Sequence, residues 1–181
     1  MLSSGWARAG VAITAMAALS CAEALAQDKA AALTDANIAA IVVGANTIDA
    51  EYGRIAKEKS TNAEVRTFAE TMIATHEAVN RQAGELAAKL GLRPVDNETS
   101  KALAEEARQM RERLRGLSGR AFDRAYIDNE GAFHQKELDA IDGVLIPGAR
   151  NAELKALLES VRPAIVGHLE HAKRLQATLG S

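Results

Sequence analysis

Cysteine is almost absent from this sequence, and its single copy, Cys21, lies inside an apolar segment near the amino terminus. If that segment is removed from the mature protein, the remaining chain has no disulfide and no thiolate ligand. Any metal site in the mature chain must then be built from histidine and carboxylate side chains.

An excess of one charge sign is also lacking, because the formal net charge is only -2. This balance disfavours binding to nucleic acid or to anionic lipid.

Aromatic residues make up only 3% of the chain, whereas hydrophobic residues reach 48%. Many of the hydrophobic residues are Ala and Leu, and they are mixed with the helix formers Glu, Lys and Arg. Such a composition favours helices, and neither a strand-like alternation nor a glycine-rich phosphate loop interrupts it.

The amino-terminal segment has the pattern of a secretory signal peptide over residues 1–26. Arg8 precedes an apolar run, and Ala24-Leu25-Ala26 before Gln27 fits a cleavage site. We therefore expect a mature domain over residues 27–181, located in the periplasm or secreted. The alternative is a lipid anchor on Cys21, since the residues before it loosely resemble a lipoprotein processing site. No later uncharged run is long enough to cross a membrane, so no transmembrane segment is expected in the mature chain.

Hydrophobic periodicity predicts four long amphipathic helices and one shorter helix in the mature chain. Asn62 and Gly91 have the sequence context of a helix start and a helix stop. The short helix follows a polar stretch around Pro94 and is expected to lie in a crossover between the second and third long helices. Its charged part, 105–115, is interpreted as a solvated face, with docking of an envelope protein partner as the alternative. The predicted helices cover about 35–59, 63–90, 100–117, 119–146 and 152–179.

Four polar side chains fall on or beside the apolar stripes, one on each long helix: Glu51, His76, His134 and His168. Each lies three or four positions from apolar residues of its own helix, so all four are expected to point inward. Facing helices of a bundle can bring such groups together, and this is how metal sites are built in bundles. The pattern therefore predicts a metal site made of these four residues.

Three imidazoles and a carboxylate suit a divalent transition metal such as Fe, Mn, Zn, Cu or Ni, and ligand type alone does not choose among them. Glu130 and Glu137 flank His134 at helical spacing and could serve as further ligands or as acceptors for imidazole N–H groups. A di-iron carboxylate oxidase is disfavoured because no Glu-x-x-His pair occurs on two helices. The alternative to a metal site is a buried polar network that only fixes helix register.

Several short motifs follow one another in a characteristic order along the mature chain. They are Glu51-Tyr52-Gly53-Arg54-Ile55-Ala56, Phe68-Ala69, Met72, His76, Phe122-Asp123, Tyr126, His134, Pro163 and His168-Leu169. With these motifs the chain resembles a bacterial exported family known as domain of unknown function 4142. The resemblance extends from about Ala36 to Leu179 and implies a ferritin-like fold and an envelope location, but no reaction. Members usually have Asp before the histidine of the second helix, whereas this chain has Thr75.

The sequence thus predicts an all-α, ferritin-like four-helix bundle with an extra short crossover helix. Two functions remain open for it. The first is a periplasmic protein that binds a transition metal in the bundle core. The second is a non-catalytic envelope or stress-related protein whose buried polar residues hold no metal. The sequence offers no candidate nucleophile, so whether the protein is an enzyme stays undecided, as does its oligomeric state.

Overall fold

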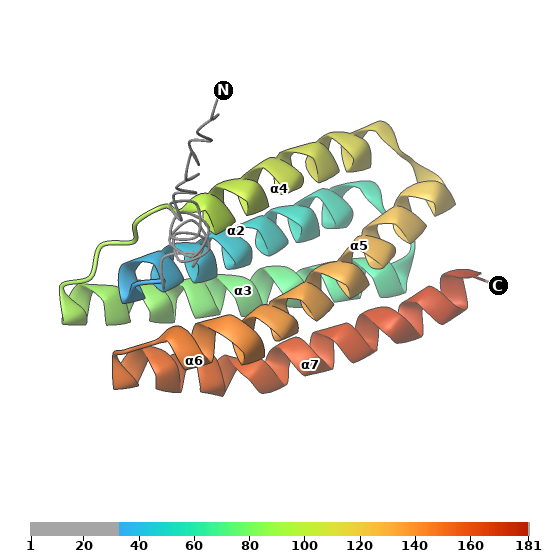
Figure 1. The fold of residues 1–181 in the computed structure, drawn as a ribbon. Coiled ribbons are helices and arrows are strands. Elements are labelled where there is room, and N and C mark those ends of the chain that lie inside the picture. Colours follow the sequence, from blue (N-terminus) through green and yellow to red (C-terminus); the bar gives the residue numbers. More distant parts are fainter. Residues whose placement is uncertain (1–32, 181) are drawn as a thin grey trace, which may run out of the picture. The chain divides into compact units, whose positions relative to one another are not determined.

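A computed structural model describes residues 33–180 of the chain, and within this range all regular structure is helical. Figure 1 shows the long helices lying roughly side by side, with the helix over Glu98–Gly116 packed on their outside. The elements in chain order are α2 (Asp35–Lys59), α3 (Ala63–Leu90), α4 (Glu98–Gly116), α5 (Gly119–Ala140), the π-helical turn η1 (Ile141–Leu145), the short α6 (Ile146–Gly148) and α7 (Ala152–Gly180).

Local sequence signals fix most helix ends. Thr34 caps α2 in a reciprocal arrangement with Asn37, and the side chain of Asn62 accepts hydrogen bonds from two backbone N–H groups at the start of α3. Both caps satisfy N–H groups that have no partner within the helix. At the end of α3, Gly91 adopts a left-handed conformation with φ of 64°, which only glycine reaches without strain. The short segment that follows then starts the crossover.

The long helices form two hairpins joined by α4. Helices α2 and α3 pack along each other, as do α5 and α7, and α4 covers α2 as the chain crosses from one hairpin to the other (Figure 1). Adjacent amphipathic helices bury their apolar stripes most completely in this way. The structure therefore confirms the predicted all-α, ferritin-like four-helix bundle with an additional crossover helix.

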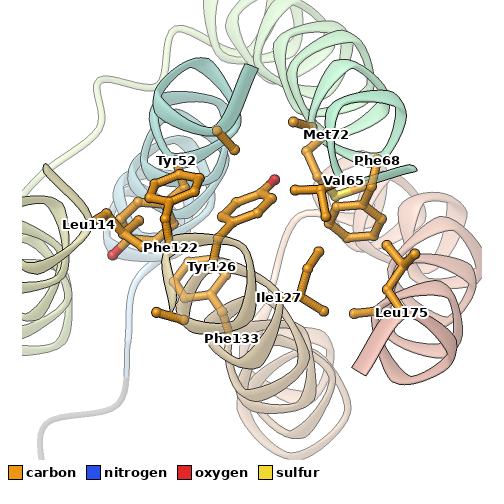
Figure 2. Close-up of a cluster of buried hydrophobic side chains, with 14 of the residues drawn as sticks. Tyr52, Val65, Phe68, Met72, Leu114, Phe122, Tyr126, Ile127, Phe133 and Leu175 are labelled. Carbon is orange, nitrogen blue, oxygen red and sulfur yellow. The ribbon is translucent and has the colours of Figure 1, made fainter. Parts of the chain in front are cut away.

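The core divides into two apolar clusters along the bundle. The larger cluster contains Phe68, Phe122 and Tyr126, which are fully buried among α3, α5 and their neighbours (Figure 2). The second cluster lies toward the other end and is built from aliphatic residues such as Ile38 and Leu158. In α5, the first cluster ends at Phe133 and the second begins at Leu138. Polar residues occupy the level between the two clusters.

The observed helix limits differ little from the predicted ones. The crossover helix begins at Glu98, slightly before the predicted start, because Asn97 provides its N-cap. The π-helical turn η1 after α5 was not predicted, since periodicity gives no signal for one extra residue in a turn. No described helix is long and apolar enough to span a membrane. The predicted signal peptide lies outside the described residues.

Candidate metal centre

Three histidines from three long helices meet in the middle of the bundle. His76 of α3, His134 of α5 and His168 of α7 are all buried, and one ring nitrogen of each lies within 4.8 Å of the others. Their ring centroids are separated by 5.2–5.6 Å. The tertiary structure thus brings together the three histidines that the sequence singled out.

The tautomer of His76 is defined by Asn46 of α2. The amide nitrogen of Asn46 donates to the carbonyl of Val42 at 2.8 Å, which orients the amide so that Oδ1 faces His76 Nδ1, also at 2.8 Å. An amide oxygen can only accept a hydrogen bond, so His76 Nδ1 must carry the proton. The other ring nitrogen, Nε2, therefore presents a lone pair to the cluster.

The tautomer of His134 is defined by its own helix. Nδ1 of His134 lies 2.9 Å from the backbone carbonyl of Glu130, one turn earlier in α5. A carbonyl oxygen also only accepts, so Nδ1 donates and Nε2 again carries a lone pair. In both histidines the N–H group is used outside the cluster, and this leaves the inward nitrogen free to bind a cation.

Asp49 of α2 supplies the acid of the cluster. Its Oδ2 atom lies 3.4 Å from Nε2 of His76 and 3.4 Å from Nε2 of His134, and its side chain is fully buried. These distances exceed a normal hydrogen bond, and neither nitrogen has another partner. When the histidines are neutral and Asp49 is ionised, three atoms with lone pairs face one another here.

Burial keeps the three imidazoles neutral. Desolvation, together with smaller contributions from the neighbouring His134 and His168, lowers the pKa of His76 to about 3. Desolvation likewise lowers the pKa of His134 and of His168 to about 4. Near neutral pH the histidines thus carry no charge and need no deprotonation before they bind a metal.

Burial acts in the opposite direction on the carboxyl groups. Burial raises the pKa of Asp49 to about 7, even though the interaction of this carboxyl with the adjacent Glu130 acts to lower it. The pKa values of Glu130 and Glu137 lie well above the ordinary value, first because of burial and then because of repulsion from Asp49. A cation placed among these groups would favour their ionised forms.

Glu130 and Glu137 both lie beside the cluster, as their spacing from His134 suggested. An oxygen of Glu137 is within 4.8 Å of ligand atoms of Asp49 and His134. One carboxyl oxygen of Glu130 lies 3.7 Å from Nδ1 of His134, and neither of its oxygens has a hydrogen-bond partner. These two residues extend the set of available oxygen donors.

Glu51 does not point inward, and this prediction was wrong. Its side chain is 40% exposed and forms an ion pair with Arg111 of α4 at 2.8 Å. Glu51 lies three positions after Ile48 and four before Ile55, an isoleucine stripe at one edge of the buried face of α2, where Ile55 is only partly buried. Asp49 and Glu51 point about 160° apart around the helix axis, so only one of them can face the core.

Asp49 was missed although the sequence held a signal for it. Val42, Ala45, Tyr52 and Ala56 surround Asp49 at spacings of three, four and seven residues, and all four are buried. Small residues in this stripe mark the face on which α2 approaches its neighbours most closely. The isoleucine stripe beside Glu51 is more hydrophobic than the stripe beside Asp49, and for this reason Glu51 was predicted instead of Asp49.

The fold and the site together define a helical bundle with a buried cluster of three histidines and carboxyl groups. The chain belongs to a family described as "Domain of unknown function (DUF4142)", whose model matches residues 20–175. This result confirms the resemblance found in the sequence. The family description names no reaction.

A solved structure with the same fold comes from Streptomyces coelicolor and is described as a secreted protein of the DUF305 group. It aligns with a TM-score of 0.69 at 15% identity and covers 81% of this chain and 94% of its own. At that identity the similarity shows the fold alone. No curated protein sequence matches the chain.

Proposed function

We propose that this protein binds a divalent transition metal ion through His76, His134, His168 and Asp49. The observation that carries the proposal is the meeting of ligand atoms without hydrogen-bond partners: Nε2 of His76 and Nε2 of His134 each lie 3.4 Å from Oδ2 of Asp49. Two donors that share an ion at roughly 2.1 Å with tetrahedral angles are themselves roughly 3.4 Å apart. The spacing of these atoms therefore suits a shared cation.

The alternative is a polar network without metal, and the hydrogen bonds of the cluster argue against it. A buried network stabilises a protein when its donors and acceptors are paired. Here Nε2 of His76, Nε2 of His134 and both oxygens of Asp49 lack a partner, as does Nδ1 of His168. One proton on Asp49 could satisfy only one of the facing nitrogens, whereas a cation would satisfy all the donors at once.

The donor set restricts the metal. Imidazole nitrogen with one carboxylate suits Fe, Mn, Zn, Cu or Ni in the divalent state, and the absence of thiolate from the cluster disfavours a strict preference for Cu(I). Such an ion could act as a Lewis acid or, if it changes oxidation state, in electron transfer. The chain's own residues would position the ion, since Asn46 and the Glu130 carbonyl orient two of the imidazoles.

We further propose that the mature protein is exported. The signal-peptide pattern of residues 1–26 supports this location, and the secreted neighbour with the same fold is consistent with it. In the periplasm or outside the cell the site would meet metal ions without the competition of cytosolic thiols.

Elemental analysis tests the proposed metal site. Protein isolated from its native cell envelope is expected to hold at least one transition metal ion per chain, and metal-free protein is expected to bind Zn(II) or Co(II) stoichiometrically. The His168→Ala variant should lose this binding, whereas Glu51→Gln should keep it because Glu51 lies outside the cluster. Wild-type protein that binds no metal in either experiment would contradict the proposal and favour the polar network.

A further inference from the structure

The histidine cluster leaves a second group of buried oxygen atoms without partners. Outside the contacts of Asp49 Oδ2, the unpartnered atoms include Oδ1 of Asp49, both carboxyl oxygens of Glu130, Oε2 of Glu137 and the hydroxyl of Tyr126. The side chains of Asp49, Glu130 and Tyr126 are fully buried. Such a set is costly in a protein interior unless a proton or a cation compensates it.

No basic side chain performs that compensation. In the part of the chain that the structure describes, the only ion-pair partners of Asp49 and Glu130 are His76 and His134, and Glu137 has none. Both histidines already use Nδ1 outside the cluster, with Asn46 or with the Glu130 carbonyl, so only their Nε2 atoms face Asp49. The carboxyl groups therefore lie together without a permanent positive charge.

Tyr126 lies one turn before Glu130 on α5 and adds a further buried oxygen to this part of the bundle. It is among the largest fully buried side chains of the protein, and its hydroxyl has no hydrogen-bond partner. Figure 2 shows its ring inside the bundle rather than on the surface of α5. Burial raises the pKa of its phenol well above the ordinary value, and the charges of Glu130 and Asp49 raise it further.

The three histidines form one group of facing ligand atoms, and Asp49, His134 and Glu137 form a second, so the two groups share His134. Nε2 of His134 can bind only one metal ion, and its Nδ1 is occupied by the Glu130 carbonyl. Oδ2 of Asp49 lies toward the two Nε2 atoms, which leaves Oδ1 for a different contact. A carboxylate with its two oxygens in different surroundings is suited to bridge two ions.

We propose that a second divalent cation binds next to the first, held by Glu137 and Glu130 and bridged to the histidine site by Asp49. This inference rests on the proposed metal site and extends it to a dinuclear centre. The second position offers only oxygen donors, and such donors favour hard cations such as Mn(II) or Mg(II) over Zn(II) or Cu(II). The two positions therefore differ in the metal that each selects.

Sequential loading tests the second position. Metal-free protein is first given one equivalent of Zn(II), which has no unpaired electrons, and Mn(II) is then added and followed by electron paramagnetic resonance. We expect one further equivalent of Mn(II) to bind to the wild-type protein. In Glu137→Gln and Glu130→Gln the protein should keep the Zn(II) and bind Mn(II) at least tenfold more weakly. Glu51→Gln is the matched control and should bind Mn(II) like the wild type.

The outcomes separate this inference from the proposed function. Protein that fails to retain Zn(II) would contradict the histidine site itself. Protein that retains Zn(II) but binds no Mn(II) would contradict the second position alone. If Glu137→Gln instead weakens Zn(II) binding and no Mn(II) binds to the wild type, Glu137 is a ligand of the first ion and the dinuclear centre is refuted. Circular dichroism of each variant shows whether it is folded before it is loaded.

Discussion

The amide oxygen of Asn46 lies 2.8 Å from Nδ1 of His76, and this hydrogen bond joins α2 to α3 beside the histidine cluster. Asn46 is itself held by a hydrogen bond to the carbonyl of Val42 one turn earlier. The backbone of α2 thereby determines which nitrogen of a histidine on α3 is free. A residue that does not touch the metal would in this way control the metal ligand.

Replacing Asn46 tests this control. In Asn46→Ala the ring of His76 can adopt either tautomer and rotate, so metal affinity should fall by about 10–100-fold, the usual effect of removing a partner of a ligating histidine. Asn46→Asp keeps an acceptor and should retain most of the affinity. Competition of each variant with a chromophoric chelator measures the change. Equal affinities for wild type and Asn46→Ala would show that Asn46 has no positioning role.

Thermal melts test His168 as a ligand. Wild-type protein in metal at about 100 times the dissociation constant should gain about 2.7 kcal/mol in its free energy of unfolding over protein in chelator. His168→Ala should lose most of this gain, because the variant lacks one of the donors. Glu51→Gln should keep it. A gain that persists fully in His168→Ala would remove His168 from the ligand set and favour a purely structural role.

The pH dependence of metal-free protein tests the surroundings of Asp49. Its pKa rises from 3.8 to about 7 on folding, so between these values the folded state binds more protons than the unfolded state. Stability from this group is therefore complete below pH 4 and is lost as the pH rises through about 7. The loss amounts to at most about 4 kcal/mol at 1.36 kcal/mol for each pH unit.

Asp49→Asn provides the reference for this measurement, because it lacks the titrating group while the histidines remain. In chelator, the stability of wild type relative to Asp49→Asn should decline from about pH 4 to 7 and then level off. Urea unfolding at several pH values gives both curves. Parallel curves would mean that Asp49 titrates normally in the folded protein. With metal present the wild type should instead be more stable than Asp49→Asn near neutral pH, since only the wild type holds the ion fully.

Gly53 tests the close approach of α2 and α3 one turn after Asp49. A Cβ atom at this position would lie 2.9 Å from the carbonyl oxygen of Ala69 and 2.9 Å from Cγ1 of Ile73. Gly53→Ala should therefore destabilise the protein by about 1–3 kcal/mol through overpacking. Gly84→Ala is the control, because its Cβ would meet nothing within 4 Å and should stabilise α3 by about 0.5–1 kcal/mol. Denaturant unfolding measures both, and a neutral Gly53→Ala would show that the helices can separate at little cost.

The amino terminus of the mature protein is predicted to be Gln27, after cleavage behind Ala24-Leu25-Ala26. Intact-mass spectrometry of protein expressed with its own leader should give the mass of residues 27–181 without lipid. A mass that corresponds to a lipid-modified Cys21 start would instead support anchoring to a membrane. An Ala26→Phe change should block the predicted cleavage, since the processing site requires small residues.

Much of the fold could be read from the sequence because its causes are local. Caps such as Asn62, the stop at Gly91 and apolar stripes of helical period specify where helices begin and end and which sides they bury. Long amphipathic helices joined by short turns then have few ways to cover their apolar faces. His76, His134 and His168 could be identified for the same reason, because each lies well inside the stripe of its own helix.

The acid and the extent of the site were decided only by the tertiary structure. Asp49 and Glu51 both lie near apolar residues of α2, and periodicity alone could not tell which side of that stripe faces the other helices. The packing of α4 decides which side of α2 faces the other long helices. It brings Arg111 to Glu51 on the outside of the bundle and leaves Asp49 inside with the histidines. The rotation of a helix about its axis depends on all its neighbours, and that information is not local to any one stretch of sequence.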